Sequence, residues 1–203
     1  MRDSRPRGPA WWVDALFMVG SACFALGAFQ PFASAVAPNL VVTVFFVGSL
    51  FFTSAALLQY LGTTDGKLWS WQPTDLAWAA SGIQLIGTFW FNINTAAARL
   101  SGLDAQQENL RVWTPDYIGS VCFLVASLLA VRLLDRPPWR AGRPWRIAGL
   151  NLLGSVFFMA AAIAAYVLPD TGDLLDASIA NTGTLLGALC FFVAARIEIT
   201  PEE

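Results

Sequence analysis

The sequence contains no histidine and few charged residues, and both absences narrow the possible functions. Histidine is the commonest general base near neutral pH and the commonest metal ligand, so both kinds of site would need other residues here. Charged residues make up 13% of the chain, whereas soluble proteins contain about 25%. The net charge of -2 provides no basic surface, and we expect no nucleic-acid partner.

Cysteine is also scarce, and Cys23, Cys122 and Cys190 each lie inside an apolar run. An odd number cannot complete a disulfide framework, so we interpret them as small packing residues. The sequence offers no pairing of a nucleophile with a base and no cluster of metal ligands. We therefore expect a protein that is not an enzyme, with no catalytic residues, no metal and no cofactor.

Apolar residues are abundant: they make up 56% of the chain, and the mean hydropathy is +0.56. About 20 residues, at 1.5 Å each, cross a bilayer as a helix, and helices satisfy their own backbone groups in lipid. Six stretches have this length: residues 12–32, 40–61, 76–98, 117–134, 147–168 and 177–197. The sequence thus predicts an all-α polytopic bundle with six transmembrane helices.

Proline and acidic residues predict where several spans begin. Thr114-Pro115-Asp116 is typical of an N-cap, a first-turn proline and an acid at the positive end of the helix dipole. Gln72-Pro73-Thr74-Asp75 predicts the same start for the third span, Pro144 starts the fifth, and Pro169 ends it. Tryptophans gather near span ends, as in an interfacial belt: Trp11, Trp12, Trp69, Trp71, Trp113, Trp139 and Trp145.

Basic residues divide unequally between the two sides of a six-span chain. One side holds Arg2, Arg5, Arg7, Lys67, Arg132, Arg136, Arg140, Arg143, Arg146 and Arg196. The other side holds only Arg99 and Arg111. By the positive-inside rule, both termini are predicted to be cytoplasmic, in a bacterial-type inner (plasma) membrane. The expected layout is a tail at 1–11, a three-helix unit at 12–98, an external loop at 99–116, a second unit at 117–197 and a tail at 198–203.

A short phrase recurs along the chain and indicates an internal repeat. Gly20-Ser21-Ala22-Cys23-Phe24 matches Gly119-Ser120-Val121-Cys122-Phe123, and Gly48 to Phe52 matches Gly154 to Phe158. The third and sixth spans align through Asp75 to Gly82 and Asp176 to Gly183, again about 100 residues apart. Because three spans form each copy, the second copy would enter from the opposite face. The expectation is two inverted three-helix repeats, as in many transporters.

The first span has a second interpretation. Its arginine-rich start, apolar stretch and Ala33-Ser34-Ala35-Val36-Ala37 also resemble a cleavable signal peptide. The repeat favours a retained helix, because the matching fourth span could not be a signal.

Small and polar residues inside the spans are the candidate functional positions. Helices in lipid approach closely at small residues, and the predicted packing residues are Gly20, Gly48, Gly119, Gly154 and Gly183. Gln84, Thr88 and Asn92 follow an i, i+4, i+8 spacing on one face, and Asn151 and Asn181 lie in later spans. Amides exposed to hydrocarbon are costly, so they should point inward. They either bond neighbouring helices together or line a polar cavity between the repeats.

No charged side chain is expected near the middle of a span; Asp14 lies about one turn inside the first. Pumps and proton-coupled carriers usually need such a charge, so these classes are disfavoured. Residues 136–146 combine arginine with Trp139 and Trp145, which suits anionic lipid headgroups. The expected partners are therefore the bilayer and these headgroups, with a homo-oligomer or another membrane protein as a further possibility.

The last two spans resemble a known family. Asn151-Leu-Leu-Gly-Ser-Val-Phe-Phe, Tyr166-Val-Leu-Pro-Asp-Thr-Gly and the run from Ala180 to Phe192 are similar to the YrhK-type domain of small bacterial membrane proteins. That resemblance implies a membrane location and a helical architecture only, and it points to no particular activity. The leading hypothesis is a structural or accessory membrane protein; the alternative is a channel or carrier for a small neutral solute, with a polar cavity between the repeats.

Overall fold

The computed structural model describes residues 8–134 and 142–200. Six long helices account for most of them: α1 (Pro9–Ala28), α3 (Pro38–Thr63), α4 (Leu76–Ala97), α6 (Thr114–Arg132), α7 (Arg143–Ala164) and α8 (Ala177–Glu198). The shorter elements are α2 (Gln30–Ala35), α5 (Ala105–Glu108) and a π-helical turn, η1 (Asn109–Trp113). Within these ranges the only β-type pairing is an isolated bridge between Val167 and Leu174. The predicted all-α bundle is confirmed.

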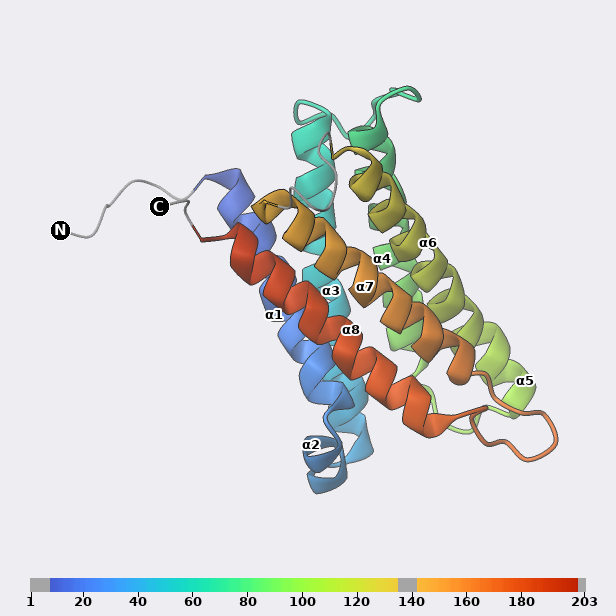
Figure 1. The fold of residues 1–203 in the computed structure, drawn as a ribbon. Helices are drawn as coiled ribbons and strands as arrows, with labels where there is room; N and C mark the ends of the chain where they lie inside the picture. Colours follow the sequence, from blue (N-terminus) through green and yellow to red (C-terminus); the bar gives the residue numbers. More distant parts are fainter. Residues whose placement is uncertain (1–7, 135–141, 201–203) are drawn as a thin grey trace.

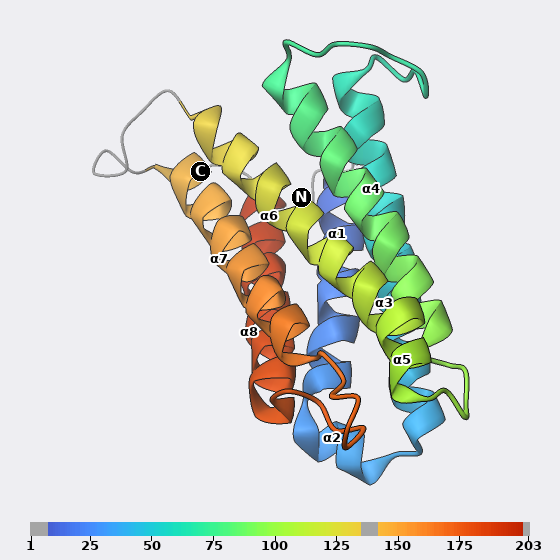
Figure 2. The same cartoon turned by 90° about the vertical axis from the view of Figure 1, so that its right-hand side faces the viewer.

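The long helices form a closed ring in chain order (Figures 1 and 2). Each packs against the next one along the chain, and α8 returns to pack against α1. Pro9 at the start of α1, Gly62 near the end of α3 and Glu198 at the end of α8 line one cavity at the same end of the bundle. Successive helices therefore run in opposite directions.

The surface of the bundle is aliphatic, which is the reverse of a soluble protein. Each long helix exposes large apolar side chains, and examples in chain order are Leu26, Leu50, Ile86, Leu128, Leu153 and Leu189. In the part of the chain that the structure describes, five helical segments are long and apolar enough to cross a membrane: Pro9–Ala28, Pro38–Thr63, Ala105–Arg132, Arg143–Ala164 and Ala177–Glu198. These segments and the aliphatic surface identify a membrane-embedded protein. Helix α4, which carries three amide side chains, is not among the five.

Consecutive helices cross in three pairs at glycine residues. In the α1–α3 pair, a Cβ atom on Gly20 would lie 3.0 Å from the carbonyl oxygen of Gly48, and one on Gly48 would lie 3.1 Å from that of Gly20. The same crossing recurs in the α4–α6 pair at Gly87 and Gly119, and in the α7–α8 pair at Gly154 and Gly187. Absence of a side chain lets the backbones touch, which is how helices associate in lipid. Gly183 on α8 is a further close contact, because a Cβ atom placed on it would lie 2.9 Å from the Phe157 carbonyl oxygen of α7.

A phenylalanine follows four residues after each crossing glycine, and the six rings form the core. Rings of α1, α4 and α7 form one triangle, with centroids 6.3, 6.0 and 6.1 Å apart. Rings of α3, α6 and α8 form a second triangle, with centroids 6.0, 6.2 and 5.7 Å apart. Contacts of 5.4, 5.0 and 5.3 Å within the helix pairs join the triangles. We call this set the phenylalanine cluster: Phe24, Phe91 and Phe158 in the first triangle, and Phe52, Phe123 and Phe191 in the second.

Hydroxyl and amide groups join one helix pair to the next. Between α3 and α4, the Ser49 and Thr95 hydroxyls are 2.9 Å apart, and Asn92 Nδ2 donates to Thr53 Oγ1 at 2.8 Å. Between α6 and α7, the Ser127 and Ser155 hydroxyls are 2.8 Å apart. Glycine crossings therefore hold each pair together, and polar contacts connect pairs at these two interfaces.

Two predicted span ends are wrong. The first helix stops at Ala28 rather than at Phe32, because Pro31 has no N–H to continue the α1 ladder. The chain bends at Phe29 and resumes as α2. The fifth helix stops at Ala164 rather than at Leu168, and Val167 instead pairs with Leu174 in the following loop.

The predicted start of the fourth span is also wrong. Thr114-Pro115-Asp116 is not an N-cap but lies inside a continuous helical segment from Ala105 to Arg132. The π-helical turn before it shifts the hydrogen-bond register, so that the Thr114 N–H reaches the Asn109 carbonyl. This turn accommodates Pro115, which has no N–H to donate and would crowd the preceding turn of a regular α-helix. The real cap is Asp104, whose side chain accepts from Gln107 N at 2.8 Å in a capping box.

Candidate binding cavities at the two ends of the bundle

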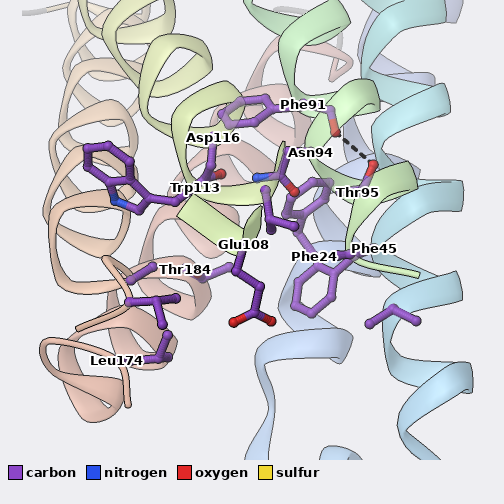
Figure 3. Close-up of a pocket in the computed structure, with 15 residues that line it drawn as sticks. Phe24, Phe45, Phe91, Asn94, Thr95, Glu108, Trp113, Asp116, Leu174 and Thr184 are labelled. Carbon is purple, nitrogen blue, oxygen red and sulfur yellow. Dashed lines mark hydrogen bonds between the residues drawn. The ribbon is translucent and has the colours of Figure 1, made fainter. Parts of the chain in front are cut away.

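Two cavities enter the bundle from opposite ends, and the phenylalanine cluster lies between them. One, of about 380 Å³, is lined by Asp14, Phe17, Phe191 and Glu198, and we call it the Asp14 cavity. The other, of about 250 Å³, is lined by Phe24, Phe91 and Asp116, and we call it the Asp116 cavity (Figure 3). Each cavity thus ends on a different triangle of the cluster.

The Asp14 cavity has two acids in its lining, and Arg143 lies within electrostatic range of Asp14. Asp14 is buried, 7% exposed, and lies close enough to Glu198 and Arg143 for electrostatic interaction. Arg143 at the start of α7 donates to the Ile197 carbonyl at 2.8 Å and to the Glu198 carbonyl at 2.7 Å. A cation that binds the last carbonyls of α8 also complements the negative end of its dipole. This end of the bundle therefore supplies its own counter-charge to the acids.

Two of the predicted polar residues meet in the Asp14 cavity. Gln84 from α4 and Asn151 from α7 line it together with Gln59 from α3. The Asn151 carbonyl accepts from Ser155 Oγ at 2.9 Å within α7 and from Ser127 Oγ of α6 at 3.4 Å, so the backbone at this position belongs to the α6–α7 contacts. Amides from separate helices thus face a space large enough for water or a small solute.

The other predicted polar residues lie elsewhere. Thr88 is fully buried and its hydroxyl donates to the Leu85 carbonyl at 2.7 Å, within its own helix. Asn92 bonds to Thr53 in the α3–α4 contact, and its Oδ1 has no hydrogen-bond partner among the described residues. Asn181 is half-buried on α8, and among the described residues it lines neither of the two cavities. The predicted packing glycines all lie in helix–helix contacts.

The Asp116 cavity combines a carboxylate with aromatic walls. Asp116 on α6 lies beside Asn94 on α4, which is placed to hydrogen-bond to it (Figure 3). The Trp113 ring lies next to it in the lining, and its indole N–H donates to the Ala162 carbonyl at 2.8 Å. Trp113 also packs against Tyr117 and Tyr166, with ring centroids 5.3 and 5.0 Å away. These contacts fix one wall of the cavity.

The helical start at Asp104 explains why Trp113 and Asp116 line the cavity. It adds Glu108 and Trp113 to the segment that ends as α6, so Asp116 lies well inside a spanning segment rather than at its edge. Asn109 anchors this segment, because its Nδ2 donates to the Val167 carbonyl at 2.7 Å and its Oδ1 accepts from Val167 N at 2.9 Å. The expectation of no charge near the middle of a span was therefore wrong for Asp116, whereas Asp14 lies about one turn inside α1, as predicted.

A signal in the sequence could have located Asp116. Asp104-Ala105-Gln106-Gln107 has the capping-box spacing, an acid followed three residues later by glutamine. Starting the helix there puts Asp116 three turns inside it. Pro115, a residue typical of the first turn of a helix, instead suggested that the helix begins at Thr114.

Comparison of the chain with models of known protein families, with curated proteins and with solved structures gave no match. Among residues 8–134 and 142–200, no three His, Cys, Asp or Glu side chains come together as metal ligands would.

Proposed function

We propose that the chain is a six-span integral membrane protein with a structural or accessory role, closed to solutes along its axis and without enzymatic activity. The phenylalanine cluster carries this proposal. Its six rings fill the axis between the two cavities with centroid separations of 5.0 to 6.3 Å between neighbours. Rings packed this closely leave no polar path for a solute.

The case for α4 as the sixth span rests on its outer face. Ile86, Phe89 and Ile93 are each about half exposed, on the same aliphatic surface as the neighbouring helices. The amide side chains of α4 lie away from this outer face: Gln84 lines the Asp14 cavity, and Asn92 donates a hydrogen bond to Thr53. The helix is polar on its inner side and apolar towards lipid, which lowers its average hydropathy without preventing it from spanning.

Charge at the two ends of the bundle supports cytoplasmic termini. Among the described basic residues, the end with the Asp14 cavity carries Lys67, Arg132, Arg143, Arg146 and Arg196. The opposite end carries Arg99 and Arg111. This favours a bacterial-type inner membrane with both termini inside. The proposal keeps α1 as a retained span, because it supplies Gly20 and Phe24 to the core. The YrhK-type resemblance fits this location.

We further propose three helical hairpins as the repeating unit, in place of two inverted halves. If the two halves were inverted copies, the α6–α7 contact would be the counterpart of the α1–α3 contact and would contain a glycine crossing. The α6–α7 contact instead contains the hydrogen bond between the Ser127 and Ser155 hydroxyls, and no crossing glycines meet there. A twofold axis in the membrane plane would also reverse the direction of winding: viewed from one side of the membrane, one half would run clockwise and the other anticlockwise. The ring instead continues in one direction through α1, α3 and α4 and then through α6, α7 and α8. A pseudo-threefold relation instead matches all three glycine crossings and both phenylalanine triangles.

Partners of the proposed bundle are lipids and membrane proteins. The loop at 136–146 was predicted to bind anionic headgroups; residues 136–141 lie outside the described residues, and Arg143 and Arg146 lie at the start of α7. A second copy of the chain or another membrane protein would bind to the aliphatic outer faces of the helices. An accessory role requires such a contact.

The closed axis predicts that the protein does not conduct neutral solutes. We expect liposomes containing the purified protein to take up glycerol or urea, measured by light scattering after an osmotic jump, at the rate of protein-free liposomes. Faster uptake that disappears in the Gln84→Leu/Asn151→Leu variant would contradict the proposal.

A carrier for a small neutral solute is the second candidate. The observation that favours it is the meeting of Gln84, Asn151 and Gln59 in one cavity. Transport would then require the phenylalanine cluster to open towards one cavity at a time. Asn92→Leu is the matched control, because Asn92 bonds to Thr53 outside the cavity and its loss should lower stability without a specific effect on uptake.

A further inference from the structure

The Asp116 cavity contains carboxylates and no basic side chain. Asp116 and Glu108 both line it, whereas none of its lining residues is Lys or Arg. An ionised carboxylate in a membrane-embedded helix is costly unless positive charge lies nearby, and otherwise the group takes up a proton. At the other end of the bundle, Arg143 lies within electrostatic range of Asp14. The Asp116 cavity has no such residue in its lining, so a bound cation would stabilise the ionised form of its carboxylates.

The walls of the cavity identify the kind of cation. Phe24, Phe45, Phe91 and Trp113 contribute aromatic rings, and most of the remaining lining is aliphatic. Sites for hard metal ions usually gather several carboxylates, and among the described residues no three acidic side chains come together. Aromatic faces beside a carboxylate instead suit an ammonium group with alkyl substituents, through charge pairing and cation–π attraction.

Size and access narrow the choice further. The volume of about 250 Å³ lies just below the usual range for small-molecule pockets, roughly 300–1,000 Å³, so the ligand must be small. Figure 3 shows Asp116 near Phe91 and Asn94, on the side of the phenylalanine cluster, with Glu108 further towards the end of the bundle. Leu174, from the loop between α7 and α8, lies at that end as well.

We propose that the Asp116 cavity binds a small organic cation, an alkylammonium or quaternary ammonium ion. The ligand enters from the end of the bundle that carries the 165–176 loop. Asp116 pairs with the charged nitrogen, Asn94 orients the carboxylate, the rings of Phe24, Phe91 and Trp113 surround the alkyl groups, and Glu108 attracts the cation at the entrance. The inference does not depend on whether any solute crosses the bundle.

Calorimetric titration of the full chain in detergent micelles tests this site, with n-butylammonium chloride as the probe and n-butanol as its neutral counterpart. We expect saturable binding of n-butylammonium and at least about tenfold weaker binding of n-butanol, because a charge-assisted contact accounts for about that ratio. This comparison uses the unaltered protein. Absence of saturable n-butylammonium binding, or equal binding of n-butanol, would overturn the proposal.

Variants then locate the site. Asp116→Asn should weaken n-butylammonium binding by about tenfold or more, and Asp116→Glu should retain most of it. Asp14→Asn is the matched control, because Asp14 is a buried acid in the opposite cavity, and it should change binding by less than about twofold. Circular dichroism checks that each variant keeps its helices. A folded Asp116→Asn protein with unchanged affinity, or a loss caused by Asp14→Asn instead, would assign the binding elsewhere.

Discussion

Replacing Gly154 by leucine should destroy the α7–α8 crossing and prevent the bundle from folding stably. A Cβ atom on Gly154 would lie 3.0 Å from the Gly187 carbonyl oxygen and 3.0 Å from Cε2 of Phe191. The first of these atoms is backbone and cannot rotate away, so the two helices would have to separate. Overpacking in a core costs about 1–3 kcal/mol, and separating the backbones should take the loss beyond that range. Unfolding in mixed detergent micelles, followed by circular dichroism, measures it.

Gly149 gives a matched control on the same helix. It is exposed, and nothing lies within 4 Å of a Cβ atom placed there. Leucine at this position should leave stability unchanged or raise it by up to about 1 kcal/mol, because leucine is a better helix former than glycine. Equal destabilisation by Gly149→Leu and Gly154→Leu would mean that these glycines are not helix-contact residues.

Truncating Phe123 to alanine should cost about 3 kcal/mol, the second large effect that the structure predicts. Its ring is 1% exposed and contacts Phe52, Phe91 and Phe191, at centroid distances of 6.0, 5.0 and 5.7 Å. Core Phe→Ala changes cost about 3–5 kcal/mol; the lower end applies here because the unfolded helix would place the ring in lipid rather than water. The loss comes from the cavity and the missing ring contacts.

The control for this change is Phe89→Ala on α4. Phe89 is 51% exposed on the outer surface, so its removal leaves no internal cavity. We expect a change of about 0.5 kcal/mol or less in the free energy of unfolding. If both variants lose similar stability in the same micelle titration, the phenylalanine cluster does not hold the bundle together.

The helical bundle could be predicted from the sequence because hydropathy and backbone satisfaction in lipid leave few alternatives. Five of the six predicted spans correspond to apolar helices of spanning length. The ends were less predictable, because they depend on local contacts. Pro115 seemed to start a helix, yet the π-helical turn accommodates it and the segment begins after Asp104.

The core could have been predicted more fully. Glycine followed four residues later by phenylalanine occurs in every long helix, and Gly87 to Phe91 and Gly187 to Phe191 are the copies that sequence alignment missed. The third and sixth spans were instead aligned through Asp75 and Asp176, which are N-caps of α4 and α8. Caps mark where helices begin, whereas the glycine and phenylalanine positions mark where they cross.

The candidate cavities were only partly predictable. The helical spacing put Gln84, Thr88 and Asn92 on one face, but only Gln84 lines a cavity, whereas Thr88 bonds within its own helix and Asn92 bonds to Thr53 on α3. Which amide meets a neighbour depends on how close the adjacent helix comes, and that distance is set by glycines on other helices. Spacing within one helix carries no information about this.

The most direct test of the account is whether α4 crosses the membrane. In a variant with Cys23, Cys122 and Cys190 replaced by alanine, single cysteines are introduced by Leu68→Cys and Ser101→Cys. Both positions are exposed, one on each side of α4 in the chain. A membrane-impermeant thiol reagent should label the Ser101→Cys protein from outside intact spheroplasts and the Leu68→Cys protein only in inverted vesicles. Labelling of both from the same side would mean that α4 does not span, and would contradict the six-span ring.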